Sequence, residues 1–489
     1  MADELHEISP VAVEDGDAER IPRVDPGRPP SRADRVARGK SARSEVPLQT
    51  HALLVPTELR ADPVELLERQ AASRVPELVP IRYGRMLVSP FSFYRGAALI
   101  MAADLAGTPN SGLRAQLCGD AHMSNFGVFA SPERHLVFDV NDFDETAPGP
   151  FEWDVKRLAA SLEIAGRENG YKAKQRRGVV KAAVTGYREA MRKFAEGSHL
   201  AVWYAHLDLD AEMESIRPLL APSRAKGVDA ALAKARTKDS SQAFEKLATV
   251  VDGQARIVSD PPLIVRVTEL LPDADASDLF AQLTTVISAY RESLPPDRRH
   301  LLEEYRFVDM ARKVVGVGSV GTRAWILLME GADSGDPLFL QAKEAQASVL
   351  EEFAGASLYS NHGQRVVVGQ HLMQGVSDIF LGWQRTKGLD GIERDFYVRQ
   401  LRDWKGSADP EAMIPSGMSI YARLCGWTLA RAHARSGDRV AIASYLGGKS
   451  TFDEAIADFA SAYADLNARD YAALQAAATS GRVEVKSGL

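Results

Sequence analysis

The sequence predicts an α+β fold with a mainly helical large lobe and a smaller antiparallel β lobe. The 489 residues exceed the roughly 250 to 300 at which single hydrophobic cores stop growing, so more than one lobe is expected. With 45% hydrophobic and 26% charged residues, the composition is that of a globular protein with ample material for a core. Strand-like patterns interrupt an otherwise helical periodicity between about residues 305 and 376.

Composition also excludes several classes of function. A net charge of −7, with no basic domain, predicts no nucleic-acid partner. No stretch approaches 18 uninterrupted apolar residues, so we expect neither a membrane span nor an export signal. Cys118 and Cys425 form no disulfide framework and no zinc-type spacing, which favours a reducing cytoplasm. Nothing in the sequence indicates the oligomeric state.

Residues 1–50 are rich in Pro, Arg and acidic residues and contain no aromatic residue. Such a segment buries little apolar area, so it predicts a disordered tail. Order is expected from Asp62, where an N-cap and a Pro at the first helical position predict a helix over 62–75. The following stretch, 82–106, predicts a short extended piece and then a helix.

The rest of the chain alternates between helical and strand-like texture. Apolar residues three or four apart predict helices through most of 155–300. From Arg312 the pattern becomes strand, glycine loop, strand, turn and strand. A helix-like 344–355, a strand at 365–373 and helices over 421–435 and 451–477 are expected next. The predicted units are therefore a tail (1–50), a catalytic segment with a helical lobe (51–304), a β lobe (305–376) and helices that complete the helical lobe (377–489).

The densest polar cluster lies between Cys118 and Asp154. Asp120 is followed by Asn125 five residues later and by Asp142 after a strand-like stretch. A loop, a hairpin and a strand end would bring these three side chains to one rim. Oxygen ligands of this kind suit Mg²⁺, and an Asp free of metal could accept a proton from an attacking hydroxyl.

A glycine-rich motif follows about 200 residues later, from Gly316 through Gly318 and Ser319 to Gly321. G-x-G-x-x-G opens a dinucleotide site when a helix follows, but here TRAWILLMEG predicts a strand. Strand, glycine loop and strand is the layout of the kinase nucleotide-binding lobe. There, backbone N–H groups cover the triphosphate and a Lys on the third strand pairs with its phosphates. Lys343 lies where that Lys is expected.

The strings GDAHMSN and NDFDE resemble the catalytic loop and metal motif of the aminoglycoside-phosphotransferase branch of the protein-kinase-like superfamily. The resemblance implies that Asp120 is the base and that Asn125 and Asp142 bind metal. Cys118 replaces the usual His before the glycine. Asp154 looks like the buried Asp downstream of the metal site in small-molecule kinases. We interpret Asp139 and Asp144 as carboxylates that lie outside the metal ligands or in solvent, and Asp144 is the better candidate of the two to touch metal.

The same resemblance implies an ATP site, or a site for another nucleoside triphosphate. Its phosphates would lie under Gly316, Gly318, Ser319 and Gly321 and on Lys343. Glu351 is expected to orient Lys343, with Glu344 and Glu352 as rivals. The strand at 365–373 would lead to a hinge that places Gln370 to Met373 near the adenine.

The motif order is reversed from that of kinases, since the glycine loop and Lys343 follow Asp120. A circularly permuted kinase-like fold explains this order, because an active site needs spatial proximity and not chain order. The alternative is that one motif is accidental. From about Leu53 onward, SPFSFYRGAA, CGDAHMSNFG, FDVNDFDET, KVVGVGSVGTR, FLQAKEA and QHLMQGVSDIFLGW identify the chain as a member of the bacterial domain of unknown function 2252 family.

The leading hypothesis is a Mg²⁺-dependent, ATP-using phosphotransferase acting on a hydroxyl of an unknown, small-molecule acceptor. Nucleotidyl transfer, a non-catalytic pseudokinase, and a metal hydrolase built on His122, Asp120, Asp139 and Asp142 are the alternatives. Tyr94 and Arg95 could contact a phosphate. The kinase-like hypothesis requires Lys343 and the glycine loop to face Asp142 across one cleft.

Overall fold

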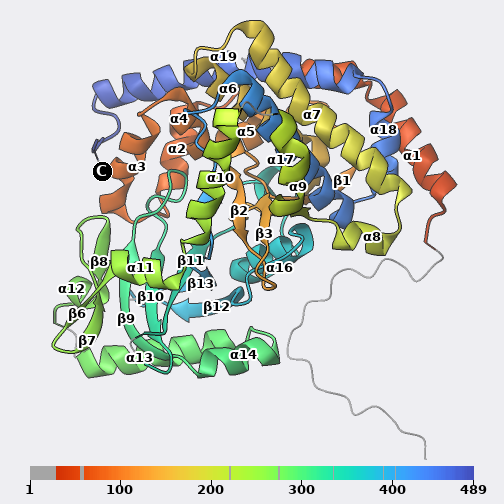
Figure 1. The fold of residues 1–489 in the computed structure, drawn as a ribbon. Coiled ribbons are helices and arrows are strands. Elements are labelled where there is room, and N and C mark those ends of the chain that lie inside the picture. Colours follow the sequence, from red (N-terminus) through yellow and green to blue (C-terminus); the bar gives the residue numbers. More distant parts are fainter. Residues whose placement is uncertain are drawn as a thin grey trace, which may run out of the picture.

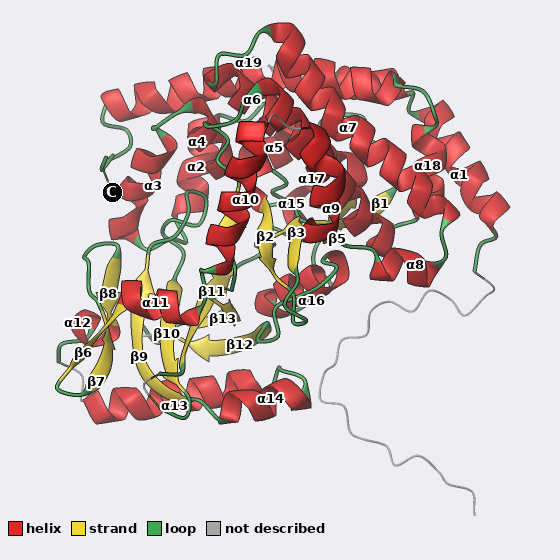
Figure 2. Ribbon diagram, viewed as in Figure 1, coloured by secondary structure: helices red, strands yellow, loops and turns green. Residues whose placement is uncertain are grey.

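A large helical lobe lies above a smaller β lobe in the computed structural model of the chain (Figure 1). The structure describes residues 29–54, 60–219, 222–273, 276–333, 335–388, 390–401 and 403–488. Figure 2 shows that helices dominate the upper lobe and that the long strands gather in the lower one. All strand pairs in the described residues are antiparallel, so the predicted α+β class is confirmed at this level.

The β lobe is a six-stranded sheet with the order β12-β13-β11-β10-β9-β8. Its centre is the predicted trio β9 (Arg306–Lys313), β10 (Ala324–Glu330) and β11 (Pro337–Ala345). The predicted boundary at residue 376 is wrong, because the sheet continues into later chain. Its remaining strands are β8 (Ile264–Arg266), β12 (Gly382–Lys387) and β13 (Glu393–Gln400).

Side chains along β11 alternate between the two faces of this sheet, and the two faces pack against different helices. Leu338 and Leu340 point to the face that α13 (Ala276–Arg291) and α14 (Pro296–Glu303) cover, below the sheet in Figure 1. Phe339 points to the opposite face and packs under α11 (Ser240–Leu247). Lys343 shares that opposite face because it is four residues further along the strand.

A smaller sheet carries the predicted polar cluster. Its order is β14-β2-β3-β5, and β2 (Phe126–Ala130) pairs with β3 (Leu136–Val140) as a hairpin. Beside it, β1 (Arg114–Leu117) pairs with β4 (Ala147–Pro150). The loop between β1 and β2 and the turn after β3 therefore end at the same edge, as the spacing predicted.

The helical lobe has one large core built from distant parts of the chain. Its main helices are α6 (Phe151–Glu168), α7 (Ala173–Glu196), α17 (Pro415–Ser436) and α19 (Thr451–Thr479). Gly426 of α17 lies so close to α7 that an added Cβ would be 2.0 Å from the Ala183 carbonyl oxygen. Glycine at this position thus permits a close approach between two long helices.

The prediction of a disordered tail is wrong for residues 29–50, while residues 1–28 lie outside the described residues. Ser31 and Asp34 form a capping box that starts α1 (Arg32–Glu45). Gly39 lets this helix lie directly on α18 (Arg439–Leu446), since a Cβ there would be 2.1 Å from the Ala441 carbonyl oxygen. Docking on a tertiary surface, which composition does not reveal, stabilises this polar helix.

Two local predictions are also wrong. Residues 82–106 hold no extended piece; they complete α3 (Val79–Met86) and form α4 (Pro90–Gly96) and α5 (Ala98–Ala106). The predicted strand at 365–373 belongs to helix α16 (His362–Met373), which Asn361 caps by accepting from the Gln364 N–H at 3.0 Å. Val366 and Val367 are fully buried, so the β-branched run of three valines resembles a buried strand in the sequence.

The predicted helix 344–355 is reduced to the four-residue α15 (Glu351–Ala354). None of the helices in the described part of the chain combines the length and hydrophobicity that a membrane span needs. The remaining elements are α2 (Pro63–Ala71), α8 (His199–Tyr204), α9 (Leu209–Ile216), α10 (Pro222–Arg236), α12 (Val267–Leu270), β5 (Leu207–Asp208), β6 (Ala248–Val251), β7 (Gln254–Ile257) and β14 (Gly406–Ser407), with 3₁₀ turns at Leu48–Ala52, Pro76–Leu78, Met123–Asn125 and Arg217–Leu219.

Candidate active site

A cleft of about 160 Å³ between the two lobes collects most of the predicted site residues. The catalytic segment lines one side of it and the glycine loop lines another. Lys343 reaches the same place through an ion pair with a cleft residue, Asp144. The predicted residues that line the cleft are Asp120, Asn125, Asp142, Asp144, Gly316, Gly318 and Ser319.

Asp120 is held by a buried arginine from the following helix. Its Oδ1 accepts from Arg157 Nη2 at 2.7 Å and Nε at 2.9 Å. The Arg157 guanidinium stacks on the Tyr94 ring, 3.9 Å from its centroid, and donates to the Tyr94 carbonyl. Burial raises the pKa of Asp120 and Arg157 opposes that rise. Arg157 therefore orients the Asp120 carboxylate through Oδ1, and the other oxygen, Oδ2, is left to face the cleft.

Asn125 and Asp142 present oxygen atoms close to this carboxylate. The Asn125 amide nitrogen donates to the Asp120 carbonyl at 2.7 Å, which fixes the side chain and leaves its Oδ1 as an acceptor. Asp142 has no cationic side chain within ion-pair distance among the described residues. Burial and the nearby Asp144 carboxylate raise the pKa of Asp142. Two adjacent carboxylates with one amide oxygen form a donor set that attracts a cation.

Asp144 is the hub that links the two lobes. It accepts from Lys343 Nζ at 2.5 Å, from the Tyr397 hydroxyl at 2.5 Å and from Ser319 Oγ at 3.2 Å. Although burial raises the pKa of Asp144, Lys343 and Tyr397 lower it to about 2. Burial opposes the charge on Lys343, yet Asp144 and Tyr397 hold the Lys343 pKa above its ordinary value. The lysine is thus a fixed cation that contacts the cleft residue Asp144.

The prediction that Glu351 orients Lys343 is wrong. Glu351 starts the short α15, where its carboxylate accepts from the Ser348 and Ser357 N–H groups and lies 3.5 Å from Arg365. It caps a turn and does not reach the lysine. The rivals are also engaged elsewhere: Glu344 pairs with Arg323 and Arg394, and Glu352 with Arg69.

The glycine loop is anchored to the helical lobe. Gly316 and Gly321 adopt positive φ angles of 64° and 91°, which glycine accommodates without strain. Val317 and Val320 are buried among residues of the N-terminal helices. The Val75 N–H donates to the Gly321 carbonyl at 2.8 Å. The loop therefore closes the cleft against the helices that precede the catalytic segment.

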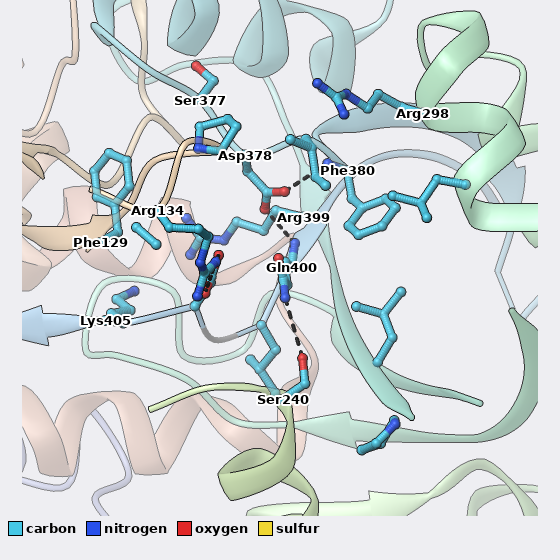
Figure 3. A pocket seen from close by; sticks show the side chains of 18 of the residues that line it. Phe129, Arg134, Ser240, Arg298, Ser377, Asp378, Phe380, Arg399, Gln400 and Lys405 are labelled. Atoms are coloured by element: carbon cyan, nitrogen blue, oxygen red, sulfur yellow. Dashed lines mark hydrogen bonds and ion pairs between the residues drawn. The ribbon is translucent and has the colours of Figure 1, made fainter. Parts of the chain in front are cut away.

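The expected hinge near adenine is not found where it was predicted. Met373 is buried in the core of the helical lobe, and Gln370 donates to Gln374 at 2.9 Å. Gln370 lines a second cavity of about 460 Å³, shown in Figure 3. Both predicted residues lie on a helix whose buried face packs against the lobe, so neither lines the cleft.

The charges around this second cavity are largely compensated within the protein. Arg134 pairs with Asp403 through Nη1, which donates to both carboxylate oxygens, and Asp378 accepts from the Phe380 and Gln400 N–H groups (Figure 3). Arg399 lies between this cavity and the catalytic cluster. Its Nη1 donates to the Asn141 carbonyl at 3.1 Å. It approaches Asp142 and Asp144 closely enough for their charges to raise its pKa against the effect of burial.

The other conspicuous carboxylates have structural roles. Asp139 is buried in an ion pair with Arg431 at 2.5 Å and accepts from the Gly375 N–H. Asp154 accepts from the Cys118 and Gly119 N–H groups and lies 3.3 Å from His433 Nε2. Asp139 is therefore not available for the hydrolase set, and Asp154 fixes the start of the loop that carries Asp120.

Sequence reasoning missed several residues that line the cleft or hold its lining side chains in place. Tyr397 faces Lys343 across the β11–β13 pair, and no local motif reveals a cross-strand neighbour. Arg157 lies near the start of helix α6, and an arginine in such a periodic helix is expected at the surface when only the sequence is known. Glu145 directly follows Asp144, and burial raises its pKa to about 7. Arg74 lines the cleft from the end of the α2 region.

The residues fit a magnesium ion better than a tightly bound structural metal. No group of three or more His, Cys, Asp and Glu side chains among the described residues is placed to hold a metal. Mg²⁺ keeps several waters and needs only one or two protein carboxylates when a substrate phosphate supplies further oxygens. Asn125 and Asp142, with Asp144 beside them, meet that requirement.

Comparisons with known proteins add the family. Neither the curated proteins nor the solved structures yielded a match to this chain. One family model matches residues 74–477, which include the cleft, the glycine loop and the helices of both ends of the helical lobe. On that match, the chain belongs to the bacterial family described as uncharacterized protein conserved in bacteria (DUF2252).

Proposed function

We propose that this protein is a Mg²⁺-dependent, kinase-like phosphotransferase that moves the terminal phosphoryl group of ATP, or of another nucleoside triphosphate, to a hydroxyl group of a small molecule. One observation carries the proposal. A single cleft joins Asp120, Asn125 and Asp142 of the catalytic segment to the glycine loop and the Lys343 ion pair of the β lobe.

The reversed order of the motifs supports a permuted arrangement. The hairpin that carries Asp142 precedes the sheet that carries Lys343 by about 200 residues, yet Asp144 and Lys343 are 2.5 Å apart. Two unrelated motifs would have no reason to meet in one cleft. The strand, glycine loop, strand and third-strand lysine also occur in the order that kinases use within their nucleotide lobe.

In this reaction the acceptor hydroxyl oxygen attacks the terminal phosphorus, and the bond from that phosphorus to the bridging oxygen breaks. Asp120 Oδ2 accepts the hydroxyl proton, and the nucleoside diphosphate leaves. Arg157 keeps the other oxygen of Asp120 in place, so the base is oriented before the acceptor binds. Catalysis of this kind depends on positioning and charge neutralisation.

Lys343 and the glycine-loop N–H groups would bind the nucleotide phosphates. Asn125 and Asp142 would hold the Mg²⁺, which when bound neutralises charge on the phosphate oxygens. At about 160 Å³ the cleft is below the roughly 300 to 1,000 Å³ of most small-molecule pockets. Asp144 fills the centre by binding Lys343 and Ser319, so an incoming phosphate would take over these two donors.

The test is nucleotide binding measured by thermal unfolding and titration calorimetry, with and without Mg²⁺. A ligand at 100 times its Kd should stabilise the wild type by about 2.7 kcal/mol. We expect Asp142→Asn to lose the Mg²⁺-dependent part and Lys343→Met to lose most of the binding. Asp465→Asn, a substitution of an exposed carboxylate on α19, is the matched control and should bind like the wild type.

Release of nucleoside diphosphate with candidate hydroxyl compounds then separates an enzyme from a sensor. Turnover that Asp120→Asn abolishes, with nucleotide binding retained, supports the proposal. Mg²⁺-dependent binding without turnover of any hydroxyl compound would instead make the chain a pseudokinase. Absence of any nucleotide-dependent stabilisation of the wild type would overturn the proposal.

A further inference from the structure

The cleft has a second, cationic wall that the proposed reaction has not yet used. It faces the catalytic segment and comes from the helices that precede it. Arg74 follows α2, and Arg95 lies near the end of α4. His122 completes the wall from the catalytic loop itself. All three side chains line the cleft.

Each of these three side chains has a buried nitrogen atom without a hydrogen-bond partner among the described residues. The atoms are Arg74 Nε, Arg95 Nε and His122 Nδ1. Buried polar atoms are nearly always paired, so three unpaired ones around one small cleft call for an explanation. A ligand that accepts hydrogen bonds at this wall would supply the partners.

The two arginines also have no directly paired carboxylate. Neither Arg74 nor Arg95 has an acidic side chain within ion-pair distance in the described part of the chain, whereas Arg157 binds Asp120 at 2.7 Å. Burial lowers the pKa of Arg74 to about 10 and lowers that of Arg95. Carboxylates of the cleft oppose this effect from a distance, chiefly Glu145 for Arg74 and Asp120 for Arg95, but none pairs directly with either guanidinium. A buried charge without a direct partner is unfavourable. This wall is therefore prepared for an anion.

The position of the wall indicates which anion. The phosphate-binding groups, Lys343 and Ser319, converge on Asp144. His122 is on the side of the base, with its Nε2 3.8 Å from Asp120 Oδ2. Arg95 is close enough to Asp120 and Asp142 for their charges to act on it, whereas Arg74 lies further along the wall at the glycine loop. His122 and Arg95 therefore place unpaired donors on the side where an acceptor would meet the base, and Arg74 extends this wall.

Packing explains only part of this wall. One Arg74 nitrogen, Nη1, donates to the Val320 carbonyl, and a Cβ added at Gly318 would be 3.1 Å from the Arg95 carbonyl oxygen. These contacts fix the two residues beside the glycine loop. They leave Arg74 Nε and Arg95 Nε without a hydrogen-bond partner.

We propose that the acceptor is an anionic hydroxyl compound, with a phosphate or carboxylate group bound by Arg95 and Arg74 while its hydroxyl lies against Asp120. This inference rests on the proposed function for the identity of the reaction. The anion site itself does not, because an anion can be bound and measured without any transfer.

The experiment compares three probes, glycerol 3-phosphate, glycerate and neutral glycerol, by titration calorimetry and thermal unfolding. Each titration is repeated with saturating Mg²⁺ and a non-hydrolysable ATP analogue. We expect the two anions to bind the wild type and glycerol not to bind. The stronger of the two anions identifies the group as phosphate or carboxylate. Arg95→Gln should weaken anion binding at least tenfold, and Arg95→Lys should restore part of it.

Arg423→Gln is the matched control, since Arg423 is an exposed arginine of α17 paired with Glu189. It should bind the anions like the wild type. Equal binding by Arg95→Gln and Arg423→Gln would overturn the assignment, as would no anion binding by the wild type. Displacement of the anion by the ATP analogue would also overturn it, because the arginines would then serve the nucleotide. Anion binding that needs Arg95, in a protein that binds no nucleotide, would refute the proposed function alone.

Discussion

At the scale of single residues, the ion pair between Lys343 and Asp144 dominates the site. The lysine side chain is 3% exposed, so its charge depends on one carboxylate and on the Tyr397 ring. Breaking a buried ion pair by removing one partner leaves an uncompensated charge. The pair therefore holds the lobes together while it holds the phosphate-binding lysine in place.

A double-mutant cycle tests this role. We expect Lys343→Met and Asp144→Asn each to reduce the free energy of unfolding by about 3 kcal/mol. The double variant should lose clearly less than the sum, because no buried charge is left alone. Urea denaturation measures all four proteins. The exposed pair Arg423 and Glu189 is the matched control, for which a coupling of about 0.5 kcal/mol is expected; an equally small coupling for the buried pair would contradict the prediction.

A buried histidine makes stability depend on pH. Burial, with the positive charge of Lys156, lowers the pKa of His51 to about 3. Its Nε2 lies 2.6 Å from the Tyr445 hydroxyl, which itself donates to the Val46 carbonyl, so the neutral ring donates. Because the folded pKa lies below the unfolded value of about 6.5, the contribution of this neutral ring is complete above that pH.

We expect that contribution to decrease by about 1.4 kcal/mol per pH unit as the pH falls from about 6 toward 3. His51→Gln keeps a donor for Tyr445 but does not titrate. The difference in unfolding free energy between the wild type and His51→Gln should therefore shrink steadily over this range. Parallel pH profiles for the two proteins would show that His51 is not the titrating group.

At the scale of elements, close packing of α7 on α17 decides which glycines are replaceable. A Cβ at Gly426 would meet the Ala183 carbonyl oxygen at 2.0 Å, and the backbone cannot yield as a flexible side chain can. Gly178 also lies within α7, but a Cβ there would meet nothing within 4 Å. The two positions share a helical conformation and differ in what surrounds them.

Gly426→Ala should therefore destabilise the protein by about 1 to 3 kcal/mol through overpacking. Gly178→Ala should stabilise it by about 0.5 to 1 kcal/mol, because alanine loses less backbone entropy in a helix. Thermal unfolding of both variants checks the pair. A destabilising Gly178→Ala, or a neutral Gly426→Ala, would show that helix packing here differs from the one described.

Elements with a clear local signal could be predicted from the sequence. β9, β10 and β11 follow from their β-branched and aromatic residues, and α2 follows from its Asp62 cap. Helix α16 could not be predicted as such, because three consecutive valines, two of them fully buried, indicate a strand until their tertiary surroundings are known. Helix α1 was missed because its stability comes from docking on α18, which lies 400 residues away in the chain.

The residues of the candidate site also fall into those that a local motif reveals and those that only the fold brings together. Asp120, Asn125, Asp142 and Lys343 belong to local motifs whose spacing is visible in one segment. The partner of Lys343 is not local: Asp144 comes from the other lobe, and Glu351 was chosen only because it follows in sequence. Arg74 is another residue that only the folded chain brings to the cleft.

At the scale of the whole molecule, the glycine loop connects the β lobe to the N-terminal helices. Val320 is fully buried among Val75, Leu78 and Ile81 of the N-terminal helices. If a nucleotide enters the cleft, this anchored loop must open first, since the cleft is smaller than most ligand pockets. Opening would then limit the rate of association.

Val320→Ala should weaken this anchor. We expect faster association of a fluorescent ATP analogue in stopped-flow mixing, together with a loss of about 2 kcal/mol in the free energy of unfolding. Val440→Ala removes the same two methyl groups from a buried site on α18 and should lower stability without changing the association rate. Unchanged association in Val320→Ala would show that the loop does not control entry.

The division of the helical lobe between the two ends of the chain also matters while the protein is being made. Helices α6 and α7 leave the ribosome early, but α17, whose surface covers them, begins at Pro415. Roughly 250 residues separate α6 from α17, which at about 5 to 20 residues per second amounts to roughly 12 to 50 seconds of translation. Throughout that interval the nascent chain exposes apolar helix faces that have no partner yet, so chaperones that shield such faces should set how much protein reaches its folded form.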